Sequence, residues 1–226
     1  EVMLNYAPQE IISHNDLLAG GRFNVQMSKV LNEKEYKKFQ KQNVDNRQKI
    51  FRYHVEGFGN VGATSGHLIP DYKMIVEQGF KSVFQKAEQT YAQLNEEEKQ
   101  GQKGEELRAM MIMAKIPKQL AEKYRKECLR LLEGEGVSEQ RKKELETMAE
   151  NLAVVPWEPA QTFWQGLQSV WLTHMLVMSE ECYPGPGVSF GRLDQYLWPL
   201  YEQDVVKNGT LSKKMAKEIF GAFIFH

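Results

Sequence analysis

The side chains that could act as nucleophiles or proton carriers are few and scattered along the chain. Cys128 lies on an apolar face of a predicted helix, where a buried and inert thiol is expected. Cys182 follows Glu180 and Glu181, whose negative charge would raise the thiol pKa and suppress its reactivity. His174 falls on an apolar helical stripe, which favours a core histidine bonded to a backbone carbonyl over a catalytic one. None of these residues indicates a nucleophilic site.

Motifs for phosphate, metal or dinucleotide binding are missing or weak. The sequence has no phosphate-binding loop, no nucleophile elbow and no His-Glu-x-x-His pair, and its histidines and cysteines do not cluster at metal-ligand spacing. Gly57, Gly59 and Gly62 match Gly-x-Gly-x-x-Gly by letter. No apolar strand precedes them, and Pro70 separates them from the next helix, so a dinucleotide site is not expected. We therefore predict no metal and no bound cofactor in this chain.

One polar segment is unusual. After a Pro/Gly turn the chain reads Ser189-Phe-Gly-Arg-Leu-Asp194 and then enters an aromatic helix. Two interpretations stay open for it. Asp194 could cap the helix while Arg192 forms an ion pair, or both residues could lie beside a cavity.

The elements that would position these residues are mostly helices. A polar helix is expected over 32–53, opening at Asn32 with Glu35 three residues later. Residues 1–30 are expected to be loop with a short strand or two, and residues 154–159 to be extended. Further helices are predicted from Pro70-Asp71 to about 94, over 105–133 with an interruption near Pro117, and over 138–152, 160–179, 195–206 and 212 onward, with a charged linker over 95–104.

Composition limits the class of protein. The chain has 226 residues, of which 42% are hydrophobic and 26% charged, as in ordinary globular proteins. A net charge of −1 gives no field that would favour nucleic acid or an anionic membrane. The most apolar window, 163–178, is too short to span a bilayer. Two cysteines and no signal peptide favour a cytoplasmic protein.

Both ends suggest a segment cut from a longer protein. The first residue is Glu1, and the last helix stops on a run of bulky apolar residues that includes Phe220, Phe223, Ile224 and Phe225. An exposed apolar run of this kind favours contact with a partner surface. The alternative is a native C-terminal helix that packs on its own domain.

Four blocks in the correct order carry a resemblance to a known family. They are Asp16–Gly20, Gly66–Phe80, Val155–Ser169 and Ser189–Tyr201. The third contains Glu-Pro-Ala-Gln-Thr-Phe-Trp-Gln-Gly-Leu-Gln and the fourth Ser-Phe-Gly-Arg-Leu-Asp-Gln-Tyr-Leu-Trp-Pro. Together they resemble the pyruvate formate-lyase-like domain of glycyl radical enzymes over nearly the whole chain.

The resemblance implies a fold and a cofactor. The family fold is a ten-stranded barrel surrounded by helices, so residues 1–226 would be part of one such domain, truncated at both ends, mainly α with an incomplete α/β barrel. The cysteine that becomes a thiyl radical and the glycine that stores the radical would lie outside this chain, which alone would be inactive. A radical S-adenosylmethionine activase would install the glycyl radical. The implied partners are this activase, a small-molecule substrate, the rest of the polypeptide and a second subunit.

Two residues carry over to the substrate pocket. The block that contains His67 matches a position that lines the pocket in relatives, where the imidazole could bond a substrate hydroxyl or help a proton leave with it. Before Ser189 the chain reads Pro184-Gly-Pro-Gly-Val188, whereas hydroxyl-eliminating and decarboxylating relatives offer a serine there. Ser189 remains as the candidate hydroxyl, and Arg192 and Asp194 would be structural residues near the pocket.

Three functions follow in order of preference. The first is an eliminase or dehydratase that cleaves a C–O, C–N or C–S bond, and the second is a carbon–carbon lyase, of the formate acetyltransferase or arylacetate decarboxylase type. The third belongs to another class, a non-catalytic helical interaction module, which the apolar C-terminal run would suit.

Overall fold

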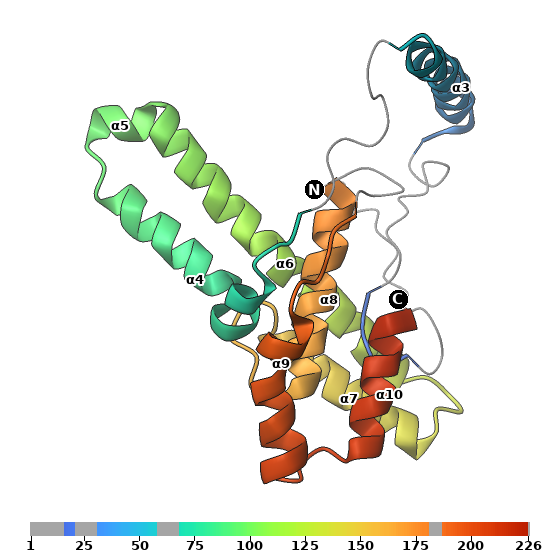
Figure 1. Ribbon diagram of the computed structural model, residues 1–226, viewed down its shortest axis with the longest axis vertical. Helices are drawn as coiled ribbons and strands as arrows, with labels where there is room; N and C mark the ends of the chain where they lie inside the picture. Colours follow the sequence, from blue (N-terminus) through green and yellow to red (C-terminus); the bar gives the residue numbers. More distant parts are fainter. Residues whose placement is uncertain (1–15, 21–30, 58–67, 181–186, 226) are drawn as a thin grey trace.

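The computed structural model describes residues 16–20, 31–57, 68–180 and 187–225, and these fold into helices and connecting turns without a β-strand (Figure 1). The mainly α expectation is thus confirmed, whereas no part of a barrel is present in the described residues. Most of the segment expected to contain short strands lies outside them. The helices are α3 (Glu33–Val55), α4 (Tyr72–Ala92), α5 (Glu96–Gln100), α6 (Gln102–Leu132), α7 (Glu139–Val154), α8 (Phe163–Glu180), α9 (Leu193–Tyr201), the π-helix η1 (Glu202–Lys207) and α10 (Lys213–Phe225).

Helix starts follow the predicted caps. Asn32 and Glu35 form a reciprocal capping box at α3, each side chain accepting the other residue's backbone N–H at 3.0 Å. Asp71 caps α4 by accepting from Met74 N, and Ser138 caps α7 by accepting from Arg141 N. A side chain that satisfies an otherwise unpaired helix N–H fixes where the helix begins.

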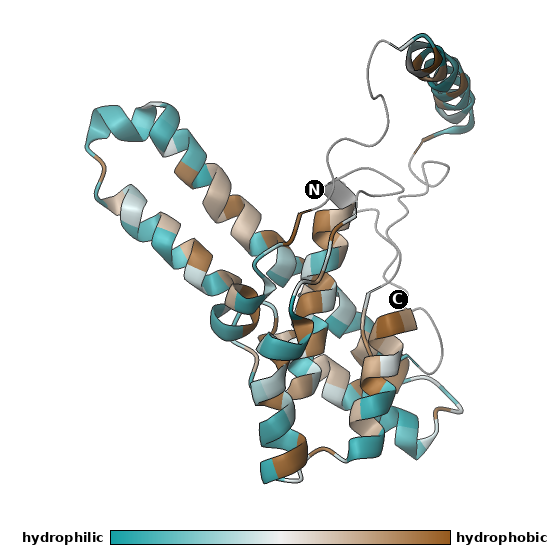
Figure 2. Ribbon diagram, viewed as in Figure 1, coloured by the Kyte–Doolittle hydropathy of each residue, from teal (hydrophilic) through white to brown (hydrophobic). Residues whose placement is uncertain are grey.

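Helix α8 forms the centre of the core. It packs against α4, α6, α7, α9 and α10, and Leu167, Val170 and Leu172 are fully buried in it. Figure 2 shows apolar residues gathered on α8 and the faces around it, whereas the region around α5 is hydrophilic. The apolar helix predicted over 160–179 is confirmed. Among the described residues, no helix combines the length and apolarity needed to cross a bilayer.

The helices α4, α5 and α6 form an arm that projects from this core (Figure 1). The linker expected over 95–104 is wrong, because Asn95 and Glu98 form a second capping box and start α5, and α6 follows directly after Gly101. The interruption expected near Pro117 is also wrong. Proline removes a single backbone N–H, and α6 runs through Pro117 with that residue buried beside Ala114, Leu120 and Ala121. We attribute the continuity to this packing.

Gly79 breaks the regular geometry of α4. Its φ of 69° and ψ of 166° lie outside the helical region, so the predicted continuous helix is kinked there. The freed backbone groups find partners in the chain that links α7 to α8. Phe80 N donates to Pro156 O at 2.9 Å, Lys81 N to Trp157 O at 2.9 Å, and Ala160 N to Val76 O at 2.9 Å. The kink therefore joins the base of the arm to the core.

The linking segment 154–159 is extended only in part. Val155 has the extended backbone expected before Pro156, with φ of −99° and ψ of 151°. Residues 155–157 nevertheless form a turn, because Glu158 N donates to Val154 O at 2.9 Å. The carboxylate of Glu158 pairs with Lys81 at 2.8 Å across the kink. Hydrogen bonds and the ion pair with residues of α4 stabilise this conformation, and the sequence of the segment alone does not reveal these contacts.

The C-terminal elements η1 and α10 complete the core around α8. Asp204, which is buried in η1, accepts from Phe163 N at 2.8 Å and so holds the first residue of α8. A turn at Gly209, with φ of 63°, leads to α10. Phe223 on α10 is 3% exposed, whereas Ile224 and Phe225 are 64% and 93% exposed.

Candidate functional site

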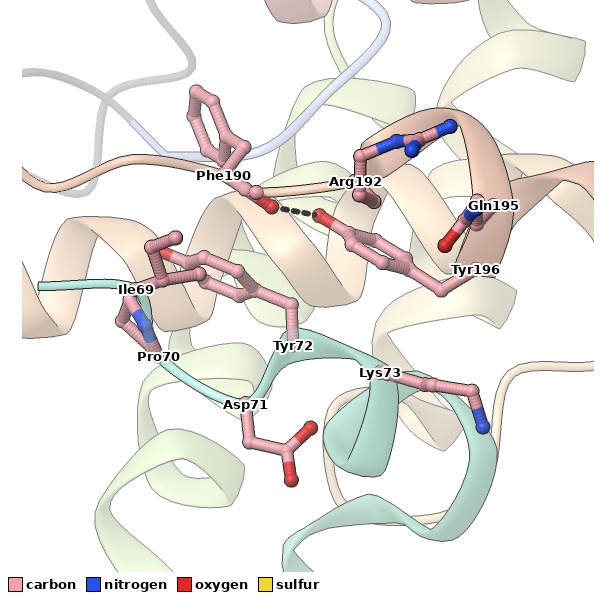
Figure 3. Close-up of a pocket in the computed structure, with 10 residues that line it drawn as sticks. Ile69, Pro70, Asp71, Tyr72, Lys73, Phe190, Arg192, Gln195 and Tyr196 are labelled. Atoms are coloured by element: carbon pink, nitrogen blue, oxygen red, sulfur yellow. Dashed lines mark hydrogen bonds between the residues drawn. The ribbon is translucent and has the colours of Figure 1, made fainter.

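An open cavity of about 360 Å³ lies between the start of α4 and the start of α9 (Figure 3). One wall comes from residues 69–73 and the other from residues 190–192, 195 and 196. The lining residues are Ile69, Pro70, Asp71, Tyr72, Lys73, Phe190, Gly191, Arg192, Gln195 and Tyr196. The resembling blocks Gly66–Phe80 and Ser189–Tyr201 therefore meet at this cavity.

Aromatic rings form the apolar part of the cavity. The ring centroid of Tyr72 lies 5.8 Å from that of Phe190 and 6.4 Å from that of Tyr196. Behind the cavity, the Phe190 ring packs 4.2 Å from the His174 imidazole and 4.9 Å from Phe223. Phe190 thus connects the cavity to α8 and α10 through ring contacts.

Hydrogen bonds fix the segment that carries Phe190. Tyr196 Oη donates to Phe190 O at 3.0 Å, the bond dashed in Figure 3. On the preceding residue, Ser189 N donates to Leu68 O at 3.0 Å. This second bond ties the two sequence blocks together through their backbones, immediately after His67 in the chain.

A buried pair of polar side chains supports the cavity from behind. Tyr72 Oη lies 2.7 Å from His174 Nδ1. Burial lowers the pKa of His174 to about 4, and burial together with the nearby Tyr196 raises the pKa of Tyr72 above its ordinary value. Both groups are therefore neutral at pH 7. The expected partner of His174 was a backbone carbonyl, and the structure corrects this to the Tyr72 side chain, because the start of α4 packs against α8.

The predicted site residues fall in different places. His67 lies outside the described residues. Ser189 is exposed and its Oγ accepts from Gly191 N at 3.1 Å. Arg192 lines the cavity and pairs with the exposed Asp194, its Nη2 lying 2.7 Å from Oδ2. This guanidinium holds the pKa of Asp194 below its ordinary value.

The expected ion pair of Arg192 is present, with Asp194 as its partner, but Asp194 is not the cap that was expected. The N-cap of α9 is Arg192, without a side-chain hydrogen bond, and Asp194 lies within the first turn. Sequence reasoning did not single out Tyr72 and Tyr196 as lining residues. The available signal was that each lies in one of the two resembling blocks near a helix start.

The other candidate groups behave as inert or stay untested. Cys128 is fully buried, and burial raises its thiol pKa to about 12, which confirms the expected unreactive cysteine. Cys182 lies outside the described residues. Within the described ranges, no group of three or more His, Cys, Asp or Glu side chains could hold a metal ion.

The described lining of the cavity combines apolar and polar groups. Its aromatic part suits the carbon skeleton of a small molecule, and Asp71, Lys73, Arg192 and Gln195 supply charged and hydrogen-bonding groups around it. Among the lining residues that the structure describes there is no cysteine or serine.

Comparisons with known proteins identify the family of this chain. Residues 24–226 match the pyruvate formate lyase-like family. The (2S)-3-sulfopropanediol dehydratase of Klebsiella oxytoca is 33% identical over 176 residues, covering 76% of this chain and 20% of the dehydratase. The indoleacetate decarboxylase of Tractidigestivibacter scatoligenes is 39% identical over 99 residues, covering 44% of this chain and 11% of that enzyme. The chain thus spans a fifth or less of the length of these curated relatives.

The fold is shared with a solved structure over almost its whole length. A glycyl radical enzyme from Archaeoglobus fulgidus superposes with a TM-score of 0.75, covering 97% of this chain and 33% of that one, at 22% identity. This likeness concerns the arrangement of the helices.

Proposed function

Because the chain belongs to the pyruvate formate lyase-like family of glycyl radical enzymes, we propose that it is one section of an enzyme that cleaves a carbon–heteroatom bond in a small organic substrate. The thiyl cysteine and the radical glycine would be supplied by chain outside residues 1–226. This section contributes the wall of the substrate pocket and the scaffold behind it, and residues 1–226 alone are inactive.

One observation supports this proposal most directly. The hydrogen bond from Ser189 N to Leu68 O joins the two blocks in which substrate-binding residues are predicted. We propose that His67 and Ser189 both contact the substrate beside the cavity. An imidazole titrates near neutral pH, so His67 can bond a substrate hydroxyl and give a proton to the departing oxygen. Arg192 and Asp194 pair with each other in the turn that follows Ser189.

The remaining partners follow from the family. A radical S-adenosylmethionine activase installs the glycyl radical, and the assembled enzyme is a cytoplasmic homodimer. The dehydratase relative, which matches 76% of the chain, supports elimination as the reaction. The decarboxylase relative, which matches 44%, makes a carbon–carbon lyase the second candidate.

The test uses the full-length protein that contains residues 1–226, produced without oxygen together with its activase. Electron paramagnetic resonance would measure the glycyl radical, and release of water, amine or sulfite from diols, hydroxyproline and sulfonates would be followed by mass spectrometry. We expect His67→Ala to lower kcat/KM about a hundredfold, because a proton donor is lost. Ser189→Ala should lower kcat/KM about tenfold, because one substrate hydrogen bond is lost.

Both variants should keep the radical signal of the parent protein, since neither residue stores the radical. Thr90→Ala, which removes an exposed hydroxyl on α4, is the matched control and should leave kcat/KM unchanged. Carbon dioxide release from arylacetates, without any elimination product, would instead assign the carbon–carbon lyase. Failure to form a radical with an activase that works on a known partner would leave the helical interaction module, and cooperative melting of a monomeric 1–226 chain would support it.

A further inference from the structure

A short segment near the beginning of the chain is held on α8 like a bound peptide. Residues 16–20 are non-helical, and Leu18 and Ala19 are fully buried. Asp16 and Leu17 are 8% and 7% exposed. The burial of these residues is comparable to that of the core.

Side chains on one face of α8 bind the main chain of this segment. Gln168 pairs with Ala19 in both directions, because its Oε1 accepts from Ala19 N at 2.8 Å and its Nε2 donates to Ala19 O at 2.9 Å. Trp164 Nε1 donates to Leu17 O at 2.6 Å, and Trp171 Nε1 donates to Gly20 O at 3.1 Å. Positions 164, 168 and 171 are spaced four and three residues apart, so they share one face of the helix.

A further contact comes from α7. Arg141 Nη1 donates to Asp16 O at 2.6 Å and is itself held by Glu144 at 3.1 Å. The Leu18 N–H finds its partner within the segment, at Asp16 Oδ1, 3.3 Å away. The hydrogen bonds to Asp16 O, Leu17 O, Gly20 O and both backbone groups of Ala19 therefore involve helix side chains.

The same face of α8 also restricts which residues can occupy positions 18 and 20 of the segment. Leu18 is completely enclosed, which requires an apolar residue at this position. Gly20 has a φ of 113°, and a Cβ built on it would lie 2.9 Å from Trp171 Nε1. A larger residue at this position would therefore be strained and would push the indole away from its acceptor.

We propose that this face of α8, formed by Trp164, Gln168 and Trp171 together with Arg141, is a peptide-binding site for a main chain of the type apolar–apolar–small–glycine. Residues 16–20 are its own ligand. Because side chains make the contacts, the site persists when the covalent link to the segment is cut, and an equivalent peptide binds in trans. This inference is independent of the proposed enzymatic function.

The test starts from the full-length protein that contains residues 1–226, with a specific protease sequence placed within residues 22–29 and cleaved after folding. The probe is a fluorescein-labelled peptide of residues 12–22, added in excess and followed by fluorescence anisotropy. We expect the N-terminal piece to co-elute with the rest after cleavage and the labelled peptide to replace it. The Gly20→Val peptide should bind at least about tenfold more weakly, because of the contact with Trp171.

Substitutions on the helices that bind the peptide provide the matched comparison. Gln168→Leu removes both bonds to Ala19 and should weaken the labelled peptide at least about tenfold. Gln119→Leu makes the same change on an exposed position of α6 and should leave binding unaltered. Equal binding of the Gly20→Val peptide, or unfolding of the cleaved chain seen by circular dichroism, would overturn the proposal. Hydrogen exchange on the uncut chain gives a second readout, since Gln168→Leu should expose the Ala19 amide while α6 stays protected.

Discussion

Gly79 is a position where both conformation and space exclude a side chain. Its φ is positive, and a Cβ there would overlap sterically with Trp157 O. We expect Gly79→Ala to lower the free energy of unfolding by about 3 kcal/mol or more, measured by urea denaturation. Gly136→Ala is the matched control, because Gly136 also has a positive φ but no atom within 4 Å of the added Cβ. It should cost only about 1–2 kcal/mol, and equal losses would show that the contact with Trp157 contributes nothing.

His174 should make stability depend on pH. Its pKa is about 4 in the folded chain and 6.5 when unperturbed, so the unfolded chain takes up the proton first as pH falls. The stability due to neutral His174 is complete above pH 6.5 and is lost as pH falls toward 4, by at most about 3 kcal/mol. Urea denaturation at several pH values checks this. His174→Gln can still accept from Tyr72 without titrating, so it should flatten the change in this window, and an unaltered slope would contradict the prediction.

At the scale of elements, the π-helix η1 should matter because it delivers a cap to α8. Asp204→Ala leaves the buried N–H of Phe163 without its acceptor and should lower the free energy of unfolding by about 1–3 kcal/mol. Asp194→Ala removes an exposed carboxylate at the start of α9 and should change stability by less than about 1 kcal/mol. Thermal denaturation of both variants measures the difference. Similar effects would show that Asp204 does not act as a cap.

Helix starts could be predicted from sequence because their signals are local. Asn32, Asp71 and Ser138 each carry the oxygen that accepts a helix N–H a few residues later. The errors occur where distant partners decide. Pro117 stays within a helix because its neighbours are buried, and Gly79 is kinked because the chain at 156–160 supplies partners for its helix.

At the scale of the whole molecule, the exposed apolar end of α10 should control association. Phe225→Ser changes a residue that is 93% exposed, so it should reduce concentration-dependent light scattering and leave stability within about 0.5 kcal/mol. Phe223→Ser is the control two residues earlier. Its side chain is 3% exposed and packs on Phe190 and Trp171, so this change should cost about 3 kcal/mol or more. Scattering that is unaffected by Phe225→Ser would contradict the prediction.

The candidate site could be predicted only in part. The resemblance named two blocks whose residues meet at the cavity, and the sequence predicted an ion pair for Arg192 without naming Asp194 as its partner. The aromatic wall did not follow, because Tyr72 and Tyr196 become neighbours only when α4 and α9 pack together, and helical periodicity carries no information on that pairing. His67 remains a prediction, since it lies outside the described residues.

The two long helices of the arm, α4 and α6, differ in their continuity. Helix α4 is kinked at Gly79, and the kink is held by hydrogen bonds from Phe80 N and Lys81 N to the carbonyls of residues 156 and 157. Helix α6 is continuous from the tip of the arm into the core. Because α4 and α6 pack against each other, a change in the bend of α4 at Gly79 would also require α6 to bend. At Pro117 the α6 backbone lacks one N–H donor, and the residue is buried. Gly79 and Pro117 are therefore positions at which the regular backbone hydrogen bonding of the arm is interrupted.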